Sequence, residues 1–278
     1  MTLNLGSIGS SVGPSEHSYD WTDTALYAAA VGAGPSQLAF LGERQTKVLP
    51  TWSVIPAWRP VFDAIERSGL GIERLLHTAQ LTEQLIPLPP SGTVSTVGTI
   101  LGITDMRVGA LLQVETRSSI AGQLHARTLW SLLVAGVGAF ESERPPPSLR
   151  TKPPKDVAPT FEQTWQTQEN QALLYRLTGD LNPIHAYPEA AHAAGLEQPI
   201  LHGLCSYAFA ARVALQALAG DEPARFKSFE ARFTKPVLPG QKLTTRGYVL
   251  EPGKAAITVL VEDTGELAIA NALFQYEV

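Results

Sequence analysis

Apolar and polar residues alternate along two long stretches of the chain. A period of two is typical of β-strands that bury one face, and glycine-containing turns separate the repeats, so we expect antiparallel strands. The first stretch predicts strands at residues 93–100, 110–119 and 123–134. The second predicts strands at residues 226–233, 242–250, 255–263 and 266–278. Residues 1 to about 20 are rich in Ser and Gly and predict a poorly ordered start.

A different pattern runs from Gly203 to Leu218, which is apolar almost all round, with Arg212 and Gln216 as its few polar interruptions. Such a segment predicts a helix that is buried and wrapped by the sheet, which is the hot-dog arrangement. Three more helices are expected, at residues 25–31, 60–68 and 172–177. Asp23 or Thr24 is expected to cap the first of them.

Landmarks of the sequence recur at a nearly constant spacing. Leu26-Tyr27 corresponds to Leu174-Tyr175, an offset of 148 residues, and Leu88-Pro89 corresponds to Leu238-Pro239, an offset of 150 residues. A constant offset over that length indicates an internal duplication. The chain is therefore predicted to be an α+β protein with a double hot-dog fold, in which each of two antiparallel sheets wraps around a central helix.

Six prolines among the sixteen residues 144–159 predict a stiff, extended linker. The linker divides the chain into an N-terminal hot-dog at residues 1–143, the first copy, and a C-terminal hot-dog at residues 160–278, the second copy. At 278 residues the chain is long enough for two domains of this size.

A carboxylate and an imidazole come close together in the second copy. Asp180 and His185 are separated by four residues, 181–184, whose turn chemistry reverses the chain, so both side chains can reach one side of a loop. About twenty residues later Gly203 opens the long helix, where uncovered N–H groups and the helix dipole favour an oxyanion. Singly, Asp180 and Asn182 are ordinary turn formers and His185 an ordinary surface histidine. As a set they favour a reaction centre.

These residues also carry a family resemblance. The strings YRLTGDLNPIH (175–185) and PILHGL (199–204) resemble the signature of the MaoC-like (R)-specific enoyl-CoA hydratases, also called hydratase 2. The residues that match this signature in type and spacing are Tyr175, Gly179, Asp180, Asn182, Pro183, His185, His202 and Gly203. The segments that look like other landmarks of the two-domain members are 26–34, 48–52 and 231–240.

The resemblance implies reversible hydration of trans-2-enoyl-CoA to (3R)-3-hydroxyacyl-CoA. By that resemblance Asp180 and His185 act on one water, and the Gly203 N–H polarises the thioester carbonyl. Asn182 is expected to orient the water or to brace the loop. Further contacts with the CoA thioester are expected from His77, Pro183, His202, Arg232, Phe233 and Lys235. Arg232 and Lys235 can equally be read as a solvated strand end.

The first copy departs from the second at the positions that carry the chemistry. Where the second copy has its Asp-to-His string, the first has Gly32-Ala33-Gly34-Pro35-Ser36, without a carboxylate or an imidazole. The first copy is therefore expected to be non-catalytic and to house the acyl tail. At the family's HGEQ-like segment this chain has His77-Thr78-Ala79-Gln80, which keeps the histidine but loses the glycine and the glutamate.

Charge and composition restrict the partners. A formal net charge of −5 and a pI near 5.7 argue against binding to nucleic acid or to an anionic membrane. One cysteine, Cys205, and the absence of a leader-like or membrane-spanning apolar run make the cytoplasm the expected compartment. No metal is expected, because His185, His192 and His202 do not follow a metal-binding spacing. The CoA thioester is expected as substrate, without any other cofactor, and a homodimer is expected.

Two alternatives belong to other classes. A hot-dog acyl-CoA thioesterase would need a carboxylate facing the thioester carbon, and offers no reason for the Asn-Pro-x-His string. A non-catalytic acyl-CoA-binding subunit would be expected to lack Asp180 or His185, and both residues are present.

Overall fold

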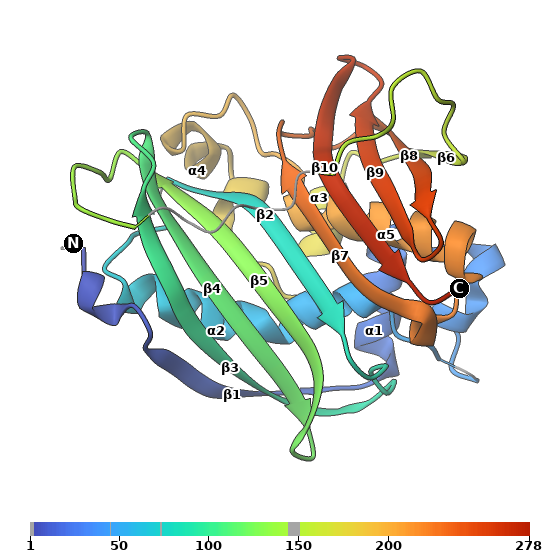
Figure 1. The fold of residues 1–278 in the computed structure, drawn as a ribbon, viewed down its shortest axis with the longest axis horizontal. Helices are drawn as coiled ribbons and strands as arrows, with labels where there is room; N and C mark the ends of the chain where they lie inside the picture. The colour runs from blue at the N-terminus through green and yellow to red at the C-terminus, as the bar shows by residue number, and fades with distance from the viewer. Residues whose placement is uncertain (1–2, 45, 73, 144–150) are drawn as a thin grey trace.

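The computed structural model describes residues 3–44, 46–72, 74–143 and 151–278, and its strands form one ten-stranded antiparallel sheet (Figure 1). The strand order across the sheet is β1-β3-β4-β5-β2-β7-β10-β9-β8-β6. The strands are β1 (Ser11–Tyr19), β2 (Leu75–Gln84), β3 (Gly92–Asp105), β4 (Gly109–Ile120), β5 (Gln123–Ala135), β6 (Phe161–Gln166), β7 (Phe226–Phe233), β8 (Lys242–Glu251), β9 (Lys254–Val261) and β10 (Glu266–Tyr276). All seven strands expected from alternation are present.

The strand order repeats between the two halves of the chain. From the edge to the centre, the first copy runs β1, β3, β4, β5, β2, and the second copy runs β6, β8, β9, β10, β7. The halves join where β2 pairs with β7, from Ala79 opposite Arg232 to Glu83 opposite Ser228. The sheet is therefore continuous across both copies.

One long helix lies against the sheet in each copy, α2 in the first and α5 in the second (Figure 1). The α-helices are α1 (Trp21–Ala30), α2 (Val54–Arg67), α3 (Gln171–Arg176), α4 (Pro188–Ala193) and α5 (Gly203–Ala219). The 3₁₀ turns are Leu5–Ser7, Pro35–Phe40, Pro50–Ser53, Pro183–His185 and Pro223–Arg225. As its all-round apolar sequence predicts, α5 is buried along almost its whole length.

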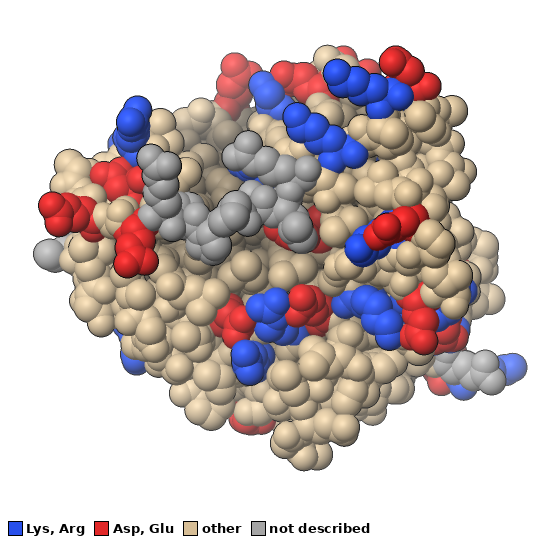
Figure 2. Space-filling view, viewed as in Figure 1, with Lys and Arg blue, Asp and Glu red and all other residues tan. Residues whose placement is uncertain are grey.

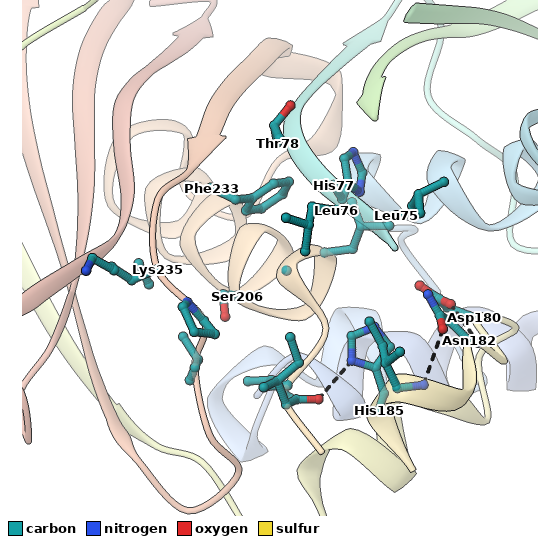
Figure 3. A pocket seen from close by; sticks show the side chains of 18 of the residues that line it. Leu75, Leu76, His77, Thr78, Asp180, Asn182, His185, Ser206, Phe233 and Lys235 are labelled. Carbon is teal, nitrogen blue, oxygen red and sulfur yellow. Dashed lines mark hydrogen bonds between the residues drawn. The ribbon is translucent and has the colours of Figure 1, made fainter. Parts of the chain in front are cut away.

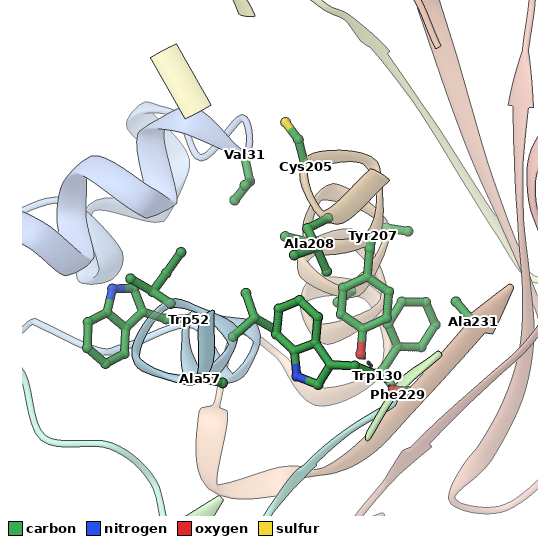
Figure 4. Packing of buried hydrophobic residues seen from close by; sticks show 14 of the residues in the cluster. Val31, Trp52, Ala57, Trp130, Cys205, Tyr207, Ala208, Phe229 and Ala231 are labelled. Carbon is green, nitrogen blue, oxygen red and sulfur yellow. Dashed lines mark hydrogen bonds between the residues drawn. The ribbon is translucent and has the colours of Figure 1, made fainter. Parts of the chain in front are cut away.

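A single hydrophobic core extends through both copies. Tyr27 of α1 and Tyr175 of α3, the residues matched by the duplication, face each other with ring centroids 5.9 Å apart. Trp130 of β5 and Tyr207 of α5 both belong to this core (Figure 4), and the Tyr207 hydroxyl donates to the Phe229 carbonyl at 2.6 Å. The two copies therefore share one core.

Both edge strands of the sheet were missed by the sequence analysis. β1 lies at one edge, where the expectation was a poorly ordered start, and β6 lies at the other. An edge strand has one neighbour and more polar residues, so its alternation is weak. The inner strand β2 (Leu75–Gln84) was not among the expected strands either. The short helix α4 was missed as well.

Two helix boundaries differ from the prediction. The cap of α1 is Asp20, whose side chain accepts from the Thr22 N–H at 2.7 Å, while Asp23 completes the box by accepting from the Asp20 N–H at 2.9 Å. α2 begins at Val54 rather than at Pro60, which lies inside the helix. A proline there removes one helical hydrogen bond, and burial of the apolar face of α2 offsets that loss.

Of the predicted linker, residues 144–150 lie outside the described residues, and residues 151–159 form neither helix nor strand.

On the face seen in Figure 2, basic and acidic side chains are interspersed rather than gathered by sign. Arg127, for example, forms ion pairs with Glu83 at 2.6 Å and with Glu115 at 2.7 Å. Such mixing lowers the field that a polyanion would require.

Candidate active site

The loop that follows α3 brings the predicted acid and base together. Gly179 has a φ of +131°, a conformation that residues with a side chain rarely adopt. The Asp180 carboxylate then accepts from the Asn182 N–H at 3.2 Å, and the Asn182 side chain accepts from the Ile184 N–H at 3.3 Å. These Asx-type turns are what the ordinary reading of the string expected. They also fix where Asp180 and His185 point.

His185 is not a surface histidine. Asp180 is 8% exposed and His185 is 7% exposed. Their side-chain ligand atoms lie within 4.8 Å of each other and of His202. Because a carbonyl oxygen can only accept, the 2.8 Å contact of His185 Nδ1 with Ile200 O places the imidazole proton on Nδ1. The Nε2 atom of neutral His185 is then left with its lone pair free.

Burial controls the charge of these groups. It raises the pKa of the Asp180 carboxyl above its ordinary value, and attraction to His185 offsets this in part. Burial lowers the pKa of His185 below its ordinary value against the pull of Asp180. For His202, burial and repulsion from His185 together lower the pKa further. The site therefore favours two neutral imidazoles beside one carboxyl group.

By distance alone, a carboxylate oxygen of Asp180 and ring nitrogens of His185 and His202 could ligate one metal ion. The two imidazole rings are stacked, however, with centroids 3.7 Å apart and planes 25° apart. Ring-nitrogen lone pairs lie in the ring plane, so nearly parallel rings cannot direct both lone pairs at one ion. In addition, His202 Nε2 donates to the Asp180 carbonyl at 3.1 Å. This geometry fits a stack that braces His185 better than a metal centre.

The start of α5 supplies the predicted oxyanion donor. Gly203 is the first residue of the helix, and its N–H has no hydrogen-bond acceptor within the described ranges. A Cβ at this position would lie 3.2 to 3.4 Å from the Phe233 ring. Glycine therefore leaves open the space in front of its own N–H, and the positive end of the helix dipole points there.

A cavity of about 450 Å³ joins these groups (Figure 3). It is mostly apolar, with a few polar atoms that converge on it, as in small-molecule sites. The second copy contributes Asp180, Asn182, Ile184, His185, Leu196, Ile200, Leu201, Gly203, Leu204, Ser206, Phe233, Thr234, Lys235, Pro236, Val237 and Ala268. The first copy contributes Trp58, Leu75, Leu76, His77, Thr78 and Leu132.

Most predicted site residues line this cavity. They are Asp180, Asn182, His185, Gly203, His77, Phe233 and Lys235. His77 comes from β2 of the first copy, stacks on Trp130 with centroids 5.0 Å apart, and has a pKa that burial lowers to about 4. Lys235 lies at the exposed side and pairs with Glu266 at 2.8 Å.

Three predicted contacts do not line the cavity. Arg232 precedes Phe233 on β7, and because successive side chains of a strand point to opposite faces, it faces away from the cavity. Pro183 is exposed and shapes the 3₁₀ turn that carries His185. His202 lies behind His185, on which it stacks.

The first-copy segment 32–36, which was expected to house the acyl tail, does not line the cavity either. A Cβ at Gly32 would lie 3.1 Å from the Trp165 ring and 3.4 Å from an Arg212 nitrogen. Buried Arg212 donates to the Val31 carbonyl at 3.0 Å and also bonds Gln37. This segment packs on the side of α5, and α2, β2 and β5 supply the first-copy wall instead.

Some lining residues were missed by the sequence analysis. Trp58 and Leu132 come from segments far apart in the sequence, and no local pattern marks them. Ser206 could have been found, because it follows Gly203 by three residues and so shares its helix face. Along the described ranges, no helix is both long and apolar enough to cross a bilayer.

Two family models match the chain, and together they include every residue that lines the cavity. Residues 150–269 match the MaoC like domain, and residues 17–136 match the MFE-2 hydratase 2 N-terminal domain. The chain is 37% identical over 262 residues to the probable enoyl-CoA hydratase 2 of Dictyostelium discoideum, covering 91% of this chain and 89% of that protein. It is 39% identical over 267 residues to the 3-hydroxyacyl-thioester dehydratase Y of Mycobacterium tuberculosis, covering 92% and 90%. The crystal structure of a MaoC-like dehydratase from Phytophthora capsici matches with a TM-score of 0.88 at 27% identity, covering 99% and 98%.

Proposed function

Because the chain belongs to the MaoC-like hydratase 2 family, we propose that it reversibly hydrates trans-2-enoyl-CoA to (3R)-3-hydroxyacyl-CoA. The resemblance and the double hot-dog fold expected from the sequence are confirmed by these relatives. The observation that carries the proposal is the buried Asp180–His185 pair, which lines the same cavity as the Gly203 N–H.

The proposed reaction uses one water and groups of this chain. The water is held between the Asp180 carboxyl and His185 Nε2, with Asn182 fixing the loop. Its oxygen bonds to the β-carbon while the pair takes one proton from it and delivers one to the α-carbon. After the reaction, Asp180 and His185 together carry the same number of protons as before it. The Gly203 N–H stabilises the negative charge that forms on the thioester oxygen.

The rest of the cavity divides the substrate between the copies. Lys235, with Thr234 beside it, lies at the exposed side and suits the CoA portion. Phe233 and His77 flank the thioester region, and the apolar wall of Trp58, Leu75 and Leu132 suits the acyl tail. Because the water, the acid–base pair and the backbone donor supply the chemistry, no cofactor besides the CoA thioester is needed.

A direct assay tests the proposal. The purified protein is incubated with trans-2-enoyl-CoAs of different chain length and branching, and the product is resolved on a chiral column. We expect the (3R) alcohol, formed by addition of both groups to one face, because acid and base share one loop. Release of free CoA would favour the thioesterase instead, and the (3S) product would reject the proposed function.

The cellular compartment and the oligomeric state are two further predictions. The composition predicts a cytoplasmic location, and a homodimer is predicted separately. Cell fractionation and light scattering of the purified protein test these two points, and neither result bears on the chemistry.

A further inference from the structure

A buried hydroxyl in the cavity has no hydrogen-bond partner. Ser206 is 2% exposed, and its Oγ atom finds neither donor nor acceptor within the described ranges. A buried hydroxyl without a partner destabilises the folded state, so most such groups are satisfied in native proteins. Ser206 lines the cavity (Figure 3), where a substrate atom can supply the missing partner.

The position of Ser206 on α5 indicates which substrate atom that is. Ser206 follows Gly203 by three residues, so both lie on one helix face with about 5–6 Å between them. Side chains on a helix lean towards its N-terminus, so the Ser206 hydroxyl leans back towards the Gly203 N–H. Because Gly203 has no side chain, nothing of its own separates the two donors.

We propose that the Ser206 hydroxyl is a second donor to the thioester carbonyl oxygen, acting beside the Gly203 N–H. This inference rests on the proposed hydratase function and adds a catalytic residue to it. In the transition state the carbonyl oxygen gains negative charge, and a donor already held in a water-poor site stabilises that charge more than it stabilises the ground state. The thioester oxygen then supplies the partner that no described protein group gives to the Ser206 hydroxyl.

The test is Ser206→Ala, with Thr245→Val as a matched control. Thr245 of β8 also carries a fully buried, unpartnered hydroxyl, but it does not line the cavity. Both variants remove an unsatisfied group, so neither is expected to lower the melting temperature of the free protein. Steady-state hydration of trans-2-butenoyl-CoA gives kcat and KM for each, and Ser206→Thr tests whether a hydroxyl restores the rate.

For Ser206→Ala we expect kcat to fall by about 10- to 100-fold with KM little changed, as for loss of one oxyanion donor. In the infrared spectrum of bound 3-hydroxybutanoyl-CoA, the thioester carbonyl stretch should move towards its value in water. Thr245→Val should leave all three quantities unchanged.

Unchanged kcat in Ser206→Ala, or a raised KM at unchanged kcat, would overturn this role, since the latter marks a ground-state contact elsewhere on the substrate. Both results leave the hydratase function standing. A wild-type protein that hydrates no enoyl-CoA would instead overturn the proposed function, and the Ser206 role with it.

Discussion

Burial sets the protonation of the two side chains proposed to hold the water. A protonated His185 has no lone pair for that water, so activity should be lost as the pH falls through the pKa of His185. Because burial lowers this pKa below its ordinary value of 6.5, the acid limb of kcat/KM should lie below pH 6.5. A pH profile with trans-2-butenoyl-CoA measures it. A limb above pH 6.5 would show that burial does not control this group.

Burial of the ionised Asp180 carboxylate lowers the free energy of unfolding. Its pKa is raised in the folded state, so the folded protein binds this proton more tightly than the unfolded chain does. The associated stability is present at low pH and is lost as the pH rises through the raised pKa. Asp180→Asn should therefore raise the melting temperature at pH 7.5, with a gain that shrinks towards pH 4, while lowering kcat by about 10²- to 10⁴-fold. A variant that is both less stable at pH 7.5 and fully active would contradict this.

Among the helices, α2 is proposed to set how far the acyl tail can extend. It touches the catalytic loop at Ile55, whose Cγ2 would lie 3.4 Å from a Cβ at Gly179. Trp58 comes almost one turn later, lines the cavity, and packs near Trp130 with ring centroids 5.8 Å apart. Trp58→Ala should raise kcat/KM for long or branched enoyl-CoAs relative to trans-2-butenoyl-CoA, since a short tail does not reach that wall. Trp21→Ala, on α1 and outside the cavity lining, is the control and should leave the ratio unchanged.

The elements that the sequence predicted correctly are those with a strong local signal. Every inner strand except β2 was predicted, because its residues alternate where one face packs on the core, and α5 is apolar all round because it lies inside that core. The edge strands β1 and β6 lack such a signal. Because proline usually stands at a helix start, Pro60 led to the prediction that α2 begins there rather than at Val54. Tertiary burial decides these elements, and no window of sequence contains that information.

Over the whole molecule, the site separates into a part that is local in sequence and a part that is not. Asp180, Asn182 and His185 lie on one loop, so their spacing was enough to bring them together. The apolar wall supplied by α2, β2 and β5 meets the second copy through the pairing of β2 with β7. The sequence therefore predicted the loop residues that line the cavity, whereas the segment predicted to house the tail, Gly32–Ser36, packs on Arg212 and Trp165 and does not line it.

Because both copies line one cavity, we predict one substrate site per chain, although the fold is duplicated. The first copy has no imidazole or carboxylate in its 32–36 segment, and its wall residues Trp58, Leu75 and Leu132 belong to the cavity that holds Asp180 and His185. Isothermal titration with butanoyl-CoA, which has no double bond to hydrate, should therefore give a stoichiometry of one. Gly203→Val should abolish that single event, because its side chain would meet the Phe233 ring where the thioester has to lie. A stoichiometry of two, or one event that survives Gly203→Val, would show that acyl-CoA binds outside this cavity and that the first copy keeps a site of its own.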